Sequence, residues 1–87
     1  MMKMRLSLTH PVTGGELDAI EAKLADILKK SGVHSYEVTT TPFEADEKEF
    51  GIYPKYWGVY QIRCGEDVPS FVSTSIREFC RESGLTW

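Results

Sequence analysis

The residues of this chain best suited to nucleophilic or metal chemistry are two cysteines and two histidines. Cys64 or Cys80 could attack a substrate beside a base, or bind a metal together with His10 and His34. The four side chains are scattered, however, and do not follow the short spacings typical of metal sites. Both cysteines also fall on apolar stripes, so we expect buried core thiols, with no metal, no cofactor and no catalytic residue.

Two other patterns could support catalysis or phosphate binding. Four closely spaced carboxylates lie between residues 44 and 49, and in a solvated loop none of them would gain the raised pKa that a general acid needs. Gly14 and Gly15 precede a helix and offer free amides to an anion, but no phosphate-loop lysine or dinucleotide fingerprint follows them. A helix cap explains these glycines, and we expect the chain not to be an enzyme.

The segment from residue 43 to 55 combines acidic residues with large apolar side chains. It is longer than the loop of about 2–5 residues that joins a usual hairpin. Such a mixture suits docking onto a basic, partly apolar patch of another protein. We predict anchors and steering charges for a protein partner at Phe43, Glu44, Asp46, Glu47, Glu49, Phe50, Tyr53 and Trp57.

A single-stranded nucleic acid is the alternative partner. Residues 56 to 64 give the strongest strand pattern, rich in aromatic and β-branched residues. The run matches the third-strand motif of RNA-recognition modules at Lys55, Trp57 and Gly58 and departs from it at other positions. The residues that would bind this ligand on an exposed sheet face are Lys3, Arg5, Trp57 and Arg63.

Composition limits the class of protein. The chain has 87 residues, enough for one domain (residues 1–87), and its net charge of −3 does not favour a protein whose main task is to neutralise phosphates. No stretch has the length of a membrane span, and the first residues lack an apolar signal core. Two cysteines are too few for a disulfide-stapled secreted scaffold. We therefore expect a cytoplasmic protein with no membrane partner.

Apolar periodicity predicts the secondary structure. Residues 2–9, 34–41 and 56–64 alternate as strands do. A capping box at Thr13 predicts a first helix that ends near Gly32. A second helix should run from about Pro69 to Gly84, and residues 85–87 could form a short last strand. The long connection between the second and third strands covers residues 43–55.

This order of elements predicts an α+β domain. The expected architecture is a ferredoxin-like β-α-β-β-α(-β) sandwich, with an antiparallel sheet and two helices on one face. The first and third strands would lie side by side in the middle. The second sheet face would stay open and would carry Trp57 among basic residues.

These observations favour a non-enzymatic protein-binding module. We expect a small regulator or inhibitor, of the kind that phages encode, acting through the acidic-aromatic segment and the open sheet face. Two alternatives stay open: weak binding of single-stranded nucleic acid on that face, and small-molecule sensing in a sheet-paired dimer. The chain would accordingly be a monomer or a homodimer.

Overall fold

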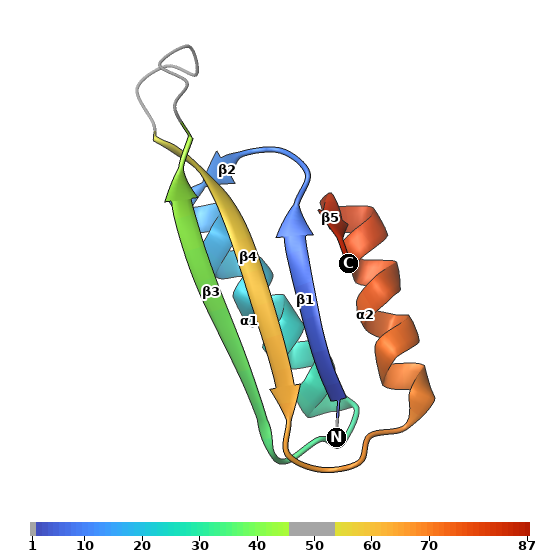
Figure 1. Cartoon of the computed structure of the whole chain (residues 1–87). Coiled ribbons are helices and arrows are strands. Elements are labelled where there is room, and N and C mark those ends of the chain that lie inside the picture. The colour runs from blue at the N-terminus through green and yellow to red at the C-terminus, as the bar shows by residue number, and fades with distance from the viewer. Residues whose placement is uncertain (1, 46–53) are drawn as a thin grey trace.

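The computed structural model describes residues 2–45 and 54–87, which form an α+β domain with an antiparallel sheet and two helices (Figure 1). The elements in chain order are β1 (Met2–Leu8), β2 (Val12–Thr13), α1 (Gly14–Lys30), β3 (Tyr36–Glu44), β4 (Lys55–Cys64), α2 (Ser70–Ser83) and β5 (Leu85–Thr86). The predicted helices are confirmed, and the last strand, which the sequence left open, is present as β5. Strand β2 was not predicted.

Strand β4 is the centre of the sheet. It pairs along its whole length with β3 on one side, from Tyr56↔Glu44 to Cys64↔Tyr36. On its other side it pairs first with β2 and then with β1, whose register runs from Met2↔Cys64 to Ser7↔Val59. Strand β5 pairs with the far edge of β1, so the two central strands come from distant parts of the chain.

One face of this sheet is covered by both helices (Figure 1). The predicted alternation is confirmed: Leu6 and Leu8 of β1 and Tyr60 and Ile62 of β4 are buried, whereas their chain neighbours are half-buried or exposed. The helices add their predicted stripes, with Leu17, Leu24, Leu28, Val72, Ile76 and Cys80 buried in the same core. Each such aliphatic side chain contributes roughly 1.5–3 kcal/mol by burial.

The ends of the helices follow their sequence signals. The Thr13 hydroxyl accepts a hydrogen bond from the backbone N–H of Glu16 at 3.2 Å, and it donates one to the Glu16 carboxylate at 3.0 Å. This is the predicted capping box, except that the carboxylate bonds to the hydroxyl. Helix α2 ends at Gly84, which adopts the left-handed conformation with φ +72°. Pro69 lies just before α2, as its N-cap residue.

Strand β3 extends further than its alternation predicts. Its residues Phe43 and Glu44 continue the ladder with β4 beyond Pro42, into the first part of the predicted 43–55 connection. At the other side of that connection Lys55 already belongs to β4. Residues 46–53 lie outside the described residues.

Pro42 is tolerated because of the phase of the β3–β4 ladder. The backbone N–H of Ala45 donates to the Lys55 carbonyl at 2.9 Å, and the N–H of Gly65 donates to the Ser35 carbonyl at 2.9 Å. Since bonded positions alternate in an antiparallel pair, odd residues of β3 face β4 and even residues direct their backbone groups outward. Pro42 therefore lacks an N–H only on the outer edge of the sheet, where no ladder bond is lost.

Candidate functional site

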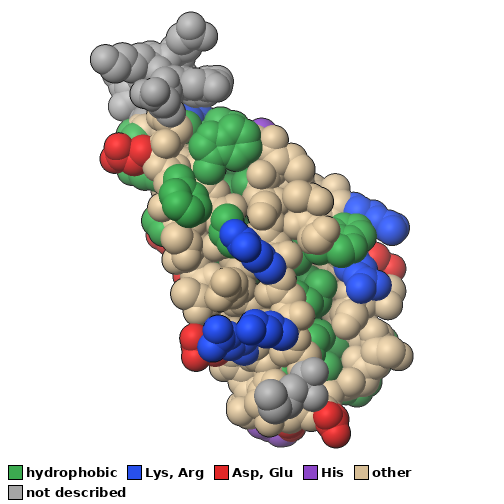
Figure 2. All heavy atoms as spheres, in the orientation of Figure 1, with side chains coloured by type: hydrophobic (Ala, Val, Ile, Leu, Met, Phe, Trp, Pro, Cys, Tyr) green, Lys and Arg blue, Asp and Glu red, His purple; other side chains and the backbone are tan. Residues whose placement is uncertain are grey.

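The open face of the sheet gathers the candidate binding residues. It is formed by the odd-numbered residues of β1, β3 and β4, which lie on the side away from the helices. Figure 2 views this face: hydrophobic side chains gather near one end and Lys and Arg side chains lie further down.

The register orders this face into four rows across the sheet. The first row holds Lys3, Arg63 and Glu37; the second holds Arg5, Gln61 and Thr39; the third holds Ser7, Val59 and Thr41; the fourth holds Trp57 and Phe43. The rows change from charged to polar to aromatic along β4. The face therefore has two chemically different ends.

Phe43 and Trp57 form the aromatic end, which we call the aromatic pair. They are directly opposite one another in the β3–β4 register. Phe43 is 53% exposed and Trp57 is 39% exposed, whereas the aromatic side chain of Tyr60 on the helix-covered face is fully buried. Two large apolar rings held side by side on strands and left open to water are typical of a contact site.

Lys3, Arg5 and Arg63 form the other end, which we call the basic cluster. All three side chains are exposed. Together with Glu37 they give the first two rows a surplus of two positive charges. Because the whole chain has a net charge of −3, all remaining residues together carry −5. The basic cluster is thus a positive patch on an acidic protein.

The structure brings together only some of the predicted site residues. Phe43 and Trp57, predicted as separate anchors, are cross-strand neighbours, and the three basic residues of the alternative site share the same face with them. Glu44 is exposed at the end of β3, but its even position places it on the opposite side from Phe43. The predicted residues that lie outside the described residues are Asp46, Glu47, Glu49, Phe50 and Tyr53.

The thiols lie in the core and the histidines lie at the surface. Cys64 and Cys80 are free and buried, as predicted. Burial raises the pKa of both thiols, which disfavours the nucleophilic thiolate. Both histidines are exposed, and His10 lies 3.3 Å from the Thr9 hydroxyl through its Nδ1 atom. Among the described residues, no group of three His, Cys, Asp or Glu side chains could hold a metal ion.

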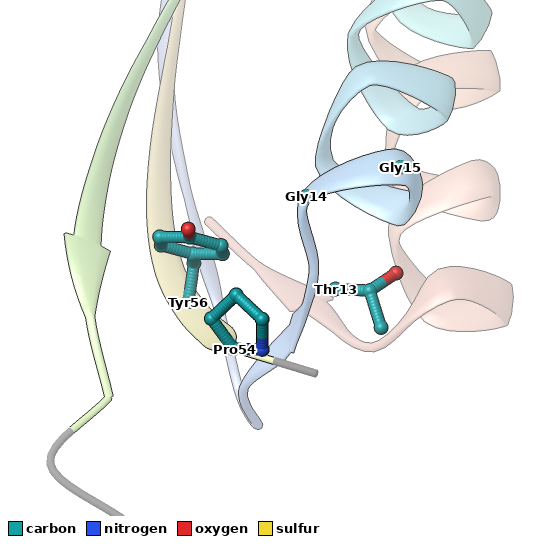
Figure 3. A pocket seen from close by; sticks show the side chains of 5 residues that line it. All are labelled: Thr13, Gly14, Gly15, Pro54 and Tyr56. Carbon is teal, nitrogen blue, oxygen red and sulfur yellow. The ribbon is translucent and has the colours of Figure 1, made fainter. Parts of the chain in front are cut away.

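A hollow of about 460 Å³ lies at the start of α1 (Figure 3). Thr13 at the end of β2 and Gly14 and Gly15 at the start of α1 line one side, and Pro54, just before β4, and Tyr56 of β4 line the other. The sequence identified the two glycines but not the two rings, because only the β2–β4 pairing brings Tyr56 next to them. The Thr13 hydroxyl is already bonded to Glu16 and is therefore not free to bind a ligand in the hollow.

The exposed side chain of Trp87 was not among the predicted site residues. Trp87 is 51% exposed and lies under two arginines of α2, with the guanidinium carbons of Arg77 and Arg81 at 5.9 and 5.7 Å from its ring centroid. Arg77 and Arg81 are one helical turn apart, and this spacing is the only sequence signal of the contact. Trp87 is more exposed than Trp57, and the guanidinium groups of both arginines lie over its ring.

No protein-family model, curated protein or solved structure matches the chain. Within the described part of the chain, neither helix combines the length and the apolar character that crossing a membrane requires. The candidate site therefore rests on the geometry of the open face alone.

Proposed function

We propose that the domain is a non-enzymatic binding module that docks a protein partner on its open sheet face. The aromatic pair is the observation that carries this proposal. Phe43 and Trp57 lie on the regular strands β3 and β4, so their positions are set before binding and little backbone entropy is lost on docking. A partner that covered both rings would bury the kind of side chain that dominates binding energy at interfaces.

The surroundings of the aromatic pair support the same function. Thr41 and Val59 lie in the next row and Thr39 and Gln61 in the row beyond. These side chains can pack or hydrogen-bond at an interface without a large cost of desolvating charge. The basic cluster at the far end would set the orientation and the association rate of the partner.

Affinity purification from the native host tests this proposal. The tagged chain and the double variant Phe43→Ala/Trp57→Ala are compared, and the variant should lose about tenfold or more of any specifically recovered partner. The matched control is Phe71→Ala/Trp87→Ala, because Phe71 is 54% and Trp87 51% exposed outside the aromatic pair. Equal recovery by the wild type and the Phe43/Trp57 variant, with both folded, would contradict the proposal.

A single-stranded nucleic acid is the second candidate ligand. The observation that favours it is the presence of two stackable rings and three cations on the same face. Fluorescence titration of the Trp87→Phe variant, in which Trp57 is the remaining tryptophan, with oligonucleotides at low salt tests this candidate. Saturable quenching that weakens with salt would support it.

We also infer that the architecture is ferredoxin-like, with β2 as an added strand. Without β2, the pairing partners follow the order β3, β4, β1 and β5, which supports the predicted central position of the first and third strands.

The free thiols Cys64 and Cys80 suit a reducing cytoplasmic setting.

A further inference from the structure

We propose that the partner presents an extended acidic segment to the open face, with an apolar anchor on the aromatic pair and carboxylates on the basic cluster. This inference rests on the proposed function and names the chemistry of the partner. It follows from the order of the four rows, in which the rings and the cations occupy opposite ends of one continuous strand surface.

The spacing of the two ends determines the length of the segment. On β4, Gln61 lies four positions after Trp57 and shares a row with Arg5. Arg63 lies six positions after Trp57. At about 3.3 Å per residue, these separations are roughly 13 Å and 20 Å. An extended peptide has nearly the same rise, so its acidic residues should lie about four to six positions from its apolar anchor.

Charge complementarity indicates a carboxylate ligand. Lys3, Arg5 and Arg63 are exposed, and Glu37 alone offsets them within the first two rows. Arginine side chains bind carboxylates in a planar, two-bond geometry, which two of the three cations can offer. A basic partner segment would instead bring like charges together at this end of the face.

The charge of the rest of the molecule favours a protein segment over a nucleic acid. The four charged side chains of the first two rows have a net charge of +2, so the remaining residues of the chain together carry −5. This field repels a long phosphate backbone, whose binding depends on many phosphate contacts. A short acidic segment carries fewer negative charges than a long phosphate backbone and is repelled less, and basic parts of the same partner would be attracted by the acidic surroundings.

Selection from a display library of random peptides tests the proposal directly. Peptides of about twelve residues are long enough to span the face when extended. The folded full chain is the bait, and parallel selections use three variants. The first, Lys3→Gln/Arg5→Gln/Arg63→Gln, removes the basic cluster; the second, Phe43→Ser/Trp57→Ser, removes the aromatic pair. The third, Lys23→Gln/Lys29→Gln/Lys30→Gln, is the control, because it removes three exposed cations from α1 with the same change in net charge.

The expected result is enrichment of peptides that carry an aromatic or large aliphatic residue about four to six positions from two or more acids. Their affinity should fall about tenfold or more for the first variant, fall with added salt, and stay unchanged for the control. Enrichment of basic or uncharged peptides, or no enrichment, would overturn the proposed partner chemistry. A labelled single-stranded oligonucleotide that bound more tightly than every selected peptide would overturn it in favour of nucleic acid.

The two proposals can fail separately. If ligands depend on Phe43 and Trp57 but not on the basic cluster, the acidic segment is wrong and the binding surface stands. If ligands bind the Phe43→Ser/Trp57→Ser variant as tightly as the wild type, the binding surface itself is wrong. Circular dichroism and urea unfolding of each variant test whether these exposed substitutions leave the fold intact.

Discussion

The hydroxyl of Tyr60 donates a hydrogen bond to the backbone carbonyl of Leu17 at 2.9 Å. Tyr60 lies at the middle of β4 and Leu17 in the first turns of α1, and both side chains are buried. Burial, reinforced by the nearby carboxylates of Glu21 and Asp18, raises the pKa of Tyr60 to about 12. The phenol therefore keeps its proton at neutral pH and holds α1 against the strand that carries Trp57.

Replacing Tyr60 with Phe should destabilise the domain by about 0.5–1.5 kcal/mol, because the buried hydrogen bond to the Leu17 carbonyl would be lost while that carbonyl keeps its bond within the helix. Urea unfolding followed by circular dichroism measures this change. The control is Tyr36→Phe, since Tyr36 is half-buried and no hydrogen bond of its hydroxyl is found within the described residues. A Tyr60→Phe variant as stable as the wild type would show that the hydrogen bond contributes nothing net.

Glu66 gives the domain a pH-dependent link between two loops. Its carboxylate accepts hydrogen bonds from the backbone N–H groups of Ser35 at 2.9 Å and His34 at 2.6 Å. These bonds hold the pKa of Glu66 below its usual value of 4.5. The resulting stabilisation is present above the unfolded-state pKa and is lost as the pH falls through the lowered folded-state pKa.

The Glu66→Ala substitution should therefore lower the urea midpoint at neutral pH, and the difference from the wild type should shrink in acid, below about pH 4. Unfolding curves across this range measure both effects. Glu78→Ala, a substitution at an exposed position of α2, is the control and should leave the midpoint nearly unchanged. A difference that stayed constant with pH would mean that Glu66 acts without its charge.

Gly58 allows α1 to pack closely on β4. A Cβ atom at this position would lie 2.7 Å from Leu17 Cδ2 and 3.2 Å from Leu8 Cδ1, and both leucines are buried. Gly58→Ala should therefore cost about 1–3 kcal/mol of stability through overpacking. Thermal unfolding measures the loss. Gly15→Ala is the control: its Cβ would meet nothing within 4 Å, and helix propensity predicts an unchanged or higher melting temperature. Equal melting temperatures for the two variants would contradict this account.

The sequence predicted those helices and strands in which the periodic pattern of apolar residues extends over several residues. Seven or more alternating residues identified β1 and β4, and the leucine stripe identified α1. The two-residue strand β2 has no period of its own. It exists because the chain turns at His10 and Pro11 and returns to β4 at Tyr56, and such a long-range contact leaves no local signal.

For the candidate site, the sequence predicted which residues share a face but not which of them are paired across the strands. Alternation correctly placed Lys3, Arg5, Arg63 and Trp57 on one face. The pairing of Phe43 with Trp57 could not be predicted, because it depends on the register of β3 against β4. A long connection between two strands does not fix their register, whereas a tight turn does.

The outer edge of β3 has a consequence for how the protein behaves at high concentration. A nine-residue edge strand is a template on which identical molecules could add in succession and aggregate. Pro42 interrupts that template, because its missing N–H falls on the outward side, where an incoming strand would need a donor. Glu37 and Glu44 add charge along the same strand. The same geometry that lets Pro42 remain in the sheet thus guards the protein against fibre-like association.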